Sequence, residues 1–164
     1  MKRLYLIGGP MGVGKTTVCR ALQRRLERSV FLDGDWCWDA HPFQVTEETK
    51  GMVLENIVFL LNNFLRCFAY DHVIFCWVLH QQAILDGLRA RLNTRDCQVR
   101  AVSLVASPEA LAARLEADIR AGRRNRGALE RSLAYLPLFG ALETEKLDVS
   151  ALTPEEAAAH LEET

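Results

Sequence analysis

The chain has 164 residues, of which 49% are hydrophobic, and a formal net charge of -1 at pH 7. A chain of this length can bury roughly 70% of the surface that it exposes when unfolded, and its near-neutral charge excludes a general attraction to nucleic acid or to an anionic membrane. Five cysteines without a CxxC pair argue against a disulfide framework and against a zinc site. We therefore expect one cytoplasmic domain over residues 1–164, with no membrane partner and with nucleic acid an unlikely one; composition indicates no particular oligomeric state.

The first predicted elements are a strand over residues 3–7 and a helix over 15–28, and the segment between them fits the pattern GxxxxGKT at every fixed position. A strand, a glycine-rich turn and a helix in this order are the context in which the pattern binds phosphate. The residues expected to hold the nucleotide are Gly9, Gly12, Val13, Gly14, Lys15, Thr16 and Thr17.

The residue types in this loop explain its chemistry. Glycines let backbone N–H groups turn toward phosphate oxygens, and the following helix adds its positive dipole end. Lys15 would place its ammonium against the β- and γ-phosphates, and the Thr16 hydroxyl would bind Mg²⁺. ATP and Mg²⁺ are therefore the expected cofactors.

A second strand, over residues 29–33, ends in two carboxylates, Asp33 and Asp35, separated by a glycine. In an open parallel sheet this strand end lies on the same rim as the phosphate loop. A carboxylate there can hold a water of Mg²⁺ or accept the proton of an attacking hydroxyl. An Asx-turn or a helix cap is the structural alternative for this pair.

Apolar runs and helix-period segments continue to alternate, which predicts a parallel sheet covered by helices. Ser107-Pro108 and Thr153-Pro154 mark two helix starts, and Gly122 is expected to close the first of these helices. Residues 121–127 read as a mobile flap. The predicted elements are helix 46–69, strand 72–78, helix 81–92, strand 98–105, helix 108–121, a short strand near 146–149 and helix 154–162.

The loop followed by Phe31-Leu32-Asp33-Gly34-Asp35 resembles the small-molecule kinases of the P-loop superfamily, especially gluconate kinase, with adenylylsulfate kinase, shikimate kinase and chloramphenicol phosphotransferase as relatives. The resemblance implies a three-layer α/β fold of the P-loop NTPase type, with a five-stranded parallel sheet flanked by helices and an arginine-rich lid at about residues 115–131. It also implies that Asp35 is the acceptor ligand or base, and that Asp33 lies near the metal together with Thr16.

The chain departs from these families after its third strand. His80 stands where gluconate kinase has a lysine, and that family's following arginine is missing, which argues against gluconate as the acceptor. The strand over 72–78 also lacks the terminal acid of a standard Walker B motif.

Arginines gather where these kinases keep their lid. Guanidinium groups delivered by lid closure would stabilise charge on the transferred phosphoryl group; the alternative is a solvated helix end, where arginine suits the helix dipole. Arg114 best matches the arginine of the family's lid helix, and the other candidate catalytic residues here are Arg120, Arg123 and Arg124.

Aromatic residues follow Asp35 closely. Trp36 and His80 are the expected acceptor-binding residues beside Asp35, and Trp38, His41 and Phe43 could line the same site or pack in the core. The helix over 46–69 is expected to be mostly buried, including its residues Met52, Phe59 and Phe68.

These residues predict a kinase that transfers the γ-phosphoryl group of ATP to a hydroxyl of a small molecule, with Lys15, Asp35 and the lid arginines in the catalytic roles. An antibiotic phosphotransferase or a nucleoside or nucleotide kinase are alternatives of the same class. A nucleotide-dependent switch without an acceptor is the alternative from another class, and a nucleic-acid end kinase is a third.

Overall fold

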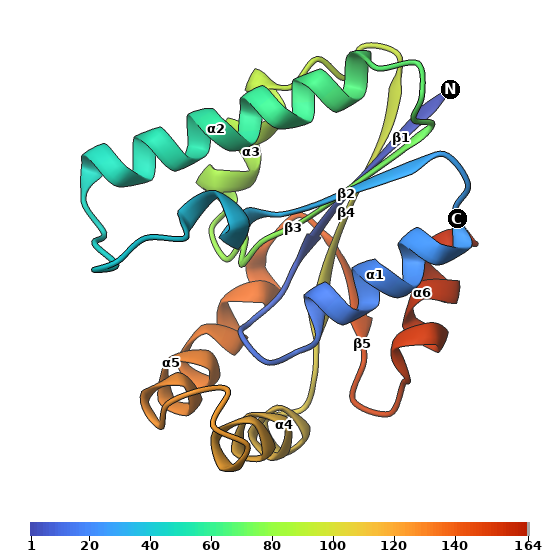
Figure 1. The fold of residues 1–164 in the computed structure, drawn as a ribbon. Helices are drawn as coiled ribbons and strands as arrows, with labels where there is room; N and C mark the ends of the chain where they lie inside the picture. Colours follow the sequence, from blue (N-terminus) through green and yellow to red (C-terminus); the bar gives the residue numbers. More distant parts are fainter. Residues whose placement is uncertain (164) are drawn as a thin grey trace.

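The computed structural model describes residues 1–163 and shows a five-stranded parallel sheet with helices on both faces (Figure 1). The strand order is β2-β3-β1-β4-β5, and each neighbouring pair is parallel. The expected fold class is therefore confirmed. The strands are β1 (Lys2–Gly8), β2 (Ser29–Asp33), β3 (His72–Cys76), β4 (Cys97–Val105) and β5 (Glu145–Asp148).

The helices cover the sheet in two layers, with α1 and α6 on one face and α2 and α3 on the other (Figure 1). The α4 and α5 helices lie beyond the end of the sheet at which β1 leads into α1. The bounds are α1 (Lys15–Arg25), α2 (Glu47–Arg66), α3 (Gln82–Arg91), α4 (Pro108–Arg120), α5 (Gly127–Tyr135) and α6 (Pro154–Glu162), with 3-10 helices η1 (Gly34–Trp38) and η2 (Leu136–Ala141).

The central strand β1 shows why the sheet is covered on both faces. Tyr5 and Ile7 belong to the apolar cluster under α1 and α6, whereas Leu4 and Leu6 belong to the cluster under α2 and α3. Because successive side chains of a strand point to opposite faces, a continuous apolar run serves both layers.

The predicted helix starts are confirmed by their capping contacts. The Ser107 hydroxyl accepts a hydrogen bond from the backbone N–H of Ala110 at 3.1 Å, and Thr153 forms a reciprocal capping box with Glu156. Gly122, with φ of 74°, follows the end of α4 as expected.

Two expectations about helices were wrong. Helix α5 and the 3-10 helix η2 occupy residues 127–141, for which the sequence pattern predicted no element. Three apolar side chains that we expected to be buried are exposed instead. Met52 and Phe59 of α2 are 51% and 66% exposed, and Phe68, which follows the end of α2, is 91% exposed. The buried residues of α2 are instead Val53, Ile57, Leu61 and Leu65.

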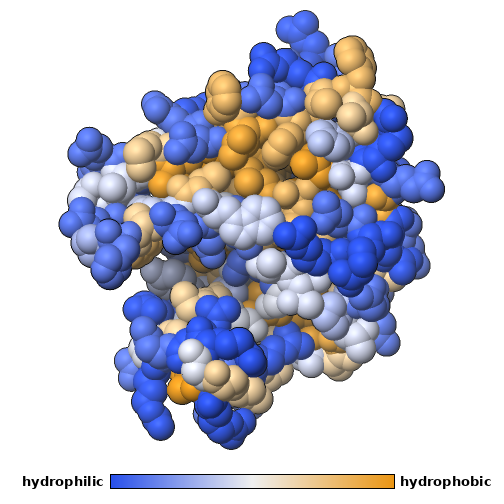
Figure 2. All heavy atoms as spheres, in the orientation of Figure 1, coloured by the Kyte–Doolittle hydropathy of each residue, from blue (hydrophilic) through white to orange (hydrophobic). Residues whose placement is uncertain are grey.

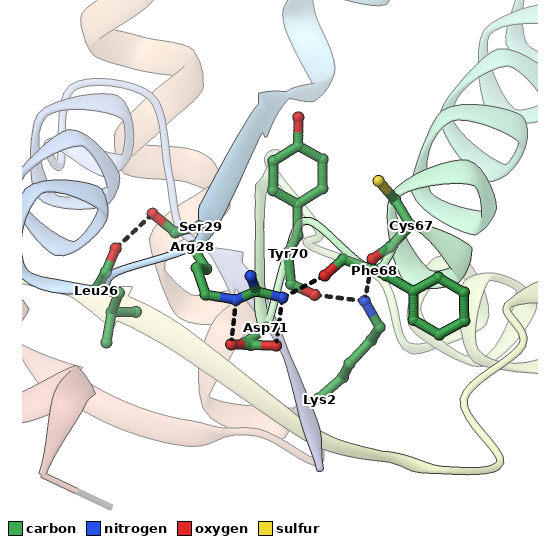
Figure 3. A network of polar contacts seen from close by, with 8 residues as sticks. All are labelled: Lys2, Leu26, Arg28, Ser29, Cys67, Phe68, Tyr70 and Asp71. Carbon is green, nitrogen blue, oxygen red and sulfur yellow. Dashed lines mark hydrogen bonds and ion pairs between the residues drawn. The ribbon is translucent and has the colours of Figure 1, made fainter.

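At the amino ends of β2 and β3, polar contacts tie the two strands together (Figure 3). Arg28, whose φ is 52°, pairs with Asp71 at 2.7 Å, and the Asp71 N–H donates to the carbonyl of Arg28 at 2.8 Å. Lys2 donates to the carbonyl of Cys67 at 2.5 Å. This corner aligns Ser29 with His72, and parallel register then sets Asp33 beside Cys76 at the other end of the sheet.

Gly34 lies directly under the Trp77 side chain, because a Cβ at this position would be 2.6 Å from Cγ of the indole. We expect Gly34→Ala to lower the free energy of unfolding by about 1–3 kcal/mol through overpacking. Gly51 in α2 is the matched control, since nothing lies within 4 Å of its added Cβ. There alanine should raise stability by about 0.5–1 kcal/mol, because it restricts the unfolded chain and favours helix. Thermal unfolding of the two variants measures both effects, and equal melting temperatures would contradict this packing.

Within residues 1–163, no helix is both long enough and apolar enough to cross a membrane.

Candidate active site at the phosphate-binding loop

The loop between β1 and α1 is held in shape by the elements around it. Gly12 adopts φ of 85°, and a Cβ there would lie 2.5 Å from Cδ2 of Leu115 in α4. A side chain at position 12 is therefore excluded twice, by the backbone conformation and by the close approach of α4. The Gly9 N–H also donates to the carbonyl of Val78 at 3.2 Å, which joins the loop to the segment after β3.

Lys15 begins α1 and turns back over the loop. Its Nζ donates to the carbonyl oxygens of Gly9 at 2.8 Å and Pro10 at 3.0 Å. Burial lowers the pKa of Lys15, and the neighbouring Asp35 and Asp33 carboxylates oppose this effect. An ammonium held by neutral carbonyls in a desolvated place is suited to a stronger anionic partner, such as a phosphate.

Thr16 and Asp33 form a pair of hard oxygen ligands. The Thr16 hydroxyl donates to Oδ2 of Asp33 at 2.6 Å, and Asp33 is buried at 6% exposure. Among the described residues no group of three or more His, Cys, Asp and Glu could hold a metal ion by itself. Two oxygen groups beside a phosphate loop fit Mg²⁺, which commonly uses one or two protein ligands together with phosphates and water.

Asp35 is fixed beside this pair. Its backbone N–H donates to Oδ1 of Asp33 at 3.0 Å, so the Asp33 side chain caps the turn into η1. The Asx-turn that sequence offered as an alternative is thus present, while both carboxylates still lie near Lys15. Partial desolvation and then the Asp33 charge raise the pKa of Asp35, whereas Lys15 and the Trp77 indole lower it. A carboxylate with a raised pKa is a better proton acceptor.

Helices α4 and α5 are bonded to the backbone of the phosphate loop. The Arg114 guanidinium donates to the carbonyl oxygens of Val13 at 2.9 Å and Val149 at 2.7 Å. The buried Ser132 hydroxyl of α5 donates to the carbonyl of Met11 at 2.5 Å. The predicted lid-helix arginine therefore joins the phosphate loop to the segment after β5.

The other predicted lid arginines lie near the end of α4. Arg123 and Arg124 both pair with Asp118, at 2.9 and 3.1 Å, while Arg120 is exposed. Arg124 is near enough to the site to influence the pKa values of both Lys15 and Asp35.

A cavity of about 180 Å³ opens beside the phosphate loop, and Asp33 is not among its lining residues. Its wall combines the Arg114 guanidinium with apolar side chains, which suits the flat face of a nucleotide base. Two further predicted nucleotide-binding residues, Gly14 and Thr17, line it. The full lining is Val13, Gly14, Thr17, Val18, Arg114, Val149, Leu152, Thr153, Pro154 and Ala157.

Replacing Arg114 tests whether this cavity serves the nucleotide. We expect Arg114→Lys to weaken binding of a non-hydrolysable ATP analogue about tenfold, because lysine cannot bond both carbonyls in the planar geometry of a guanidinium and one charged hydrogen bond is worth about 1.5 kcal/mol or more. Arg89→Lys on the exposed side of α3 is the control. Unchanged affinity in both variants would place the base elsewhere.

Two residues that we predicted to bind the acceptor together with Asp35, Trp36 and His80, pack against other aromatic rings. Trp36 packs edge-on against Phe31 at 5.2 Å and lies under the Arg20 guanidinium at 5.1 Å. His80 stacks on Tyr135 of α5, with ring centroids 4.7 Å apart. Sequence reasoning missed Trp77 and Tyr135: Trp77 reads as the end of an apolar run, and Tyr135 lies in a helix that was not predicted.

Comparisons with known proteins agree with this fold. A family model described as an AAA domain matches residues 6–132. No curated protein sequence matches the chain.

Several solved structures, two of them kinases by their descriptions, share this fold over nearly the whole chain. A gluconokinase from Sinorhizobium meliloti 1021 is 22% identical with a TM-score of 0.67, covering 96% of this chain and 90% of its own. The tunicamycin resistance protein of Deinococcus radiodurans is 20% identical with a TM-score of 0.67, covering 98% and 94%. The APS kinase of Mycobacterium tuberculosis, in complex with AMPPNP and APS, is 15% identical with a TM-score of 0.67, covering 98% and 95%. At these identities the likeness concerns the fold.

Proposed function

Because the chain belongs to the AAA-domain family of P-loop proteins, we propose that it is an ATP- and Mg²⁺-dependent kinase that transfers the γ-phosphoryl group to a hydroxyl of a small molecule. The observation that carries the proposal is the contact series from Thr16 through Asp33 to Asp35, which brings a metal-ligand pair and a second carboxylate together beside Lys15. These are the groups that phosphoryl transfer requires of a protein.

Each residue has one task in this proposal. Lys15 moves from the carbonyls of Gly9 and Pro10 to the phosphates, and Thr16 and Asp33 hold Mg²⁺ directly or through its water. The ion neutralises charge on the phosphates when bound. Asp35 orients the acceptor hydroxyl and accepts its proton.

The lid arginines complete the site. We place Arg124 on the transferring phosphoryl group, because it already influences the pKa of Lys15 and Asp35 from its place beside Asp118. Arg120 and Arg123 are the further candidates. Arg114 holds the base pocket, and residues 115–131 act as the lid of a single domain over residues 1–164.

The expected compartment follows from the cysteines. All five are free, and Cys19 and Cys76 are buried. Unpaired thiols are usual in reducing compartments, which supports a cytoplasmic location.

The experiment is a mass-spectrometric screen of a metabolite extract and an antibiotic panel, incubated with MgATP and either wild-type protein or Asp35→Asn. A compound that gains one phosphoryl group only with wild type supports the kinase and identifies its acceptor. ADP that accumulates equally with both proteins, without a phosphorylated product, would instead favour a nucleotide-dependent switch.

A further inference from the structure

Two groups of aromatic rings are joined by the segment after β3, which carries both Trp77 and His80, and we refer to Trp38, Phe43, Trp77, His80 and Tyr135 as the ring site. Trp38 of η1 lies 5.1 Å from Phe43 and 6.5 Å from Trp77, measured between ring centroids. On the other side, His80 and Tyr135 stack with an interplanar angle of 6°. Figure 2 shows the surface hollowed in this region, between the η1–α2 segment above and α4–α5 below.

The ring site is attached directly to the proposed base. Trp77 covers Gly34, the residue before Asp35, and its indole lies close enough to lower the pKa of the Asp35 carboxyl. The half-buried Trp38 and Trp77 pack on the apolar cluster under α2 and α3, whereas Phe43 and Tyr135 are 60% and 38% exposed. Phe43 and Tyr135 therefore provide the exposed ring faces of the ring site.

A left-handed residue holds the two halves of the site in place. Leu79, between Trp77 and His80, is fully buried and adopts φ of 45°, a left-handed conformation that is strained for a leucine. The segment is also bonded to β1, since the Trp77 N–H donates to the carbonyl of Ile7 at 3.1 Å. The strained turn points His80 toward α5 instead of continuing the strand.

The segments that carry Trp38, Phe43, Trp77 and His80 offer no cation to an acidic acceptor. Residues 34–46 and 77–81 contain Asp35 and Asp39 and no lysine or arginine. At the start of α2, Lys50 is paired with Glu47 at 2.6 Å, so its charge is matched. A bound carboxylate or phosphate normally has a guanidinium or ammonium partner, and these segments offer none.

His80 does not replace such a cation. Desolvation lowers the pKa of His80, and its Nδ1 is buried without a hydrogen-bond partner, so the ring is neutral at physiological pH. Arg20 of α1 lies over the rings of Phe31 and Trp36. These segments therefore offer aromatic faces and negative charge, while the cations that reach Asp35, Lys15 and Arg124, are assigned above to the nucleotide phosphates and the transferring phosphoryl group.

We propose that the acceptor is a hydroxyl compound that carries a flat ring and no negative charge, with the ring against Tyr135 and the hydroxyl at Asp35. This inference rests on the kinase function proposed above. In the reaction the acceptor oxygen forms a bond to the γ-phosphorus and the bond from that phosphorus to the β–γ bridging oxygen breaks. Asp35 takes the hydroxyl proton and returns it to solvent, and ADP leaves.

The test measures binding of matched compounds in the presence of Mg²⁺ and AMPPNP. Phenyl β-glucoside is compared with methyl β-glucoside, which lacks the aromatic ring, and with phenyl β-glucuronide, which adds a carboxylate. Thymidine against its 5′-monophosphate and tryptophol against indole-lactate repeat the charge comparison on other rings. In at least one series we expect the neutral ring compound to bind about five- to tenfold more tightly than its partners, as one aromatic contact allows.

Tyr135→Ala should remove this advantage, whereas Leu138→Ala, at an exposed position of η2 outside the ring site, should keep it. Unchanged affinity for AMPPNP shows that both variants are folded. Tighter binding of the anionic members, no advantage in any series, or no effect of Tyr135→Ala would overturn the inference. Phosphorylation of gluconate or shikimate by the wild type would also overturn it while leaving the kinase function standing, whereas failure to bind AMPPNP at all would count against both.

Discussion

Lys15→Met is expected to reduce the rate of phosphoryl transfer on the order of 10²- to 10³-fold, the usual cost of removing a preorganised charge from a transition state. The fold should not suffer. Because burial lowers the pKa of Lys15, the ammonium is held in the protein at a cost, and a methionine of similar length removes that cost. The measurements are the turnover rate at saturating MgATP and the melting temperature.

Lys146→Met is the control, because Lys146 is an exposed residue of β5 whose ammonium also donates to backbone carbonyls, those of Leu142 and Thr144, each at 2.7 Å. Loss of turnover in both variants, or a large fall in melting temperature for Lys15→Met, would contradict the role assigned to Lys15.

Asp35→Asn is expected to reduce transfer about 10²- to 10⁴-fold, the range for a general base, with little change in nucleotide affinity. The pH profile gives a second signature. Desolvation and the Asp33 charge raise the pKa of Asp35, so the wild-type rate should rise with pH through that raised value as the carboxylate forms. The variant should lack this limb of the profile.

The stability of the folded protein should fall over the same pH range in which the rate rises. A carboxyl whose pKa is raised on folding binds its proton more tightly in the folded state, so its ionisation lowers stability as pH rises through the unfolded and then the folded pKa. Asp35→Asn removes this charge, and its melting temperature near neutral pH should equal or exceed that of wild type. A variant that lost activity only because it unfolded would contradict this account.

The sequence predicted the sheet and the phosphate loop well because their signals are local. The run from Leu4 to Ile7 is apolar throughout, as a strand buried on both faces requires, and the glycine pattern marks the turn that follows. Asp33 and Asp35 could be placed on the same rim as the loop because parallel strands end together.

The parts that failed depend on contacts distant in the sequence. Helix α5 is attached to the fold by the hydrogen bond from Ser132 to the carbonyl of Met11, near the start of the chain. The sequence around residue 132 contains no pattern that predicts this bond. The exposed Met52 and Phe59 belong to an apolar helix whose buried stripe starts at Val53, a register that only the packed sheet decides. Trp77 and Tyr135 approach the site from segments that no local pattern connects.

The central claim, that the γ-phosphoryl group of ATP passes to an acceptor, is tested most directly with ATP labelled by ¹⁸O in the γ-phosphoryl group. The protein is incubated with the labelled nucleotide, Mg²⁺ and the compound identified by the screen, and the products are weighed by mass spectrometry. We predict an organic product that is heavier by one phosphoryl group carrying the label, formed in equal amount to ADP. Label found only in inorganic phosphate, with the organic compound unchanged, would show that water is the sole acceptor and would contradict the account.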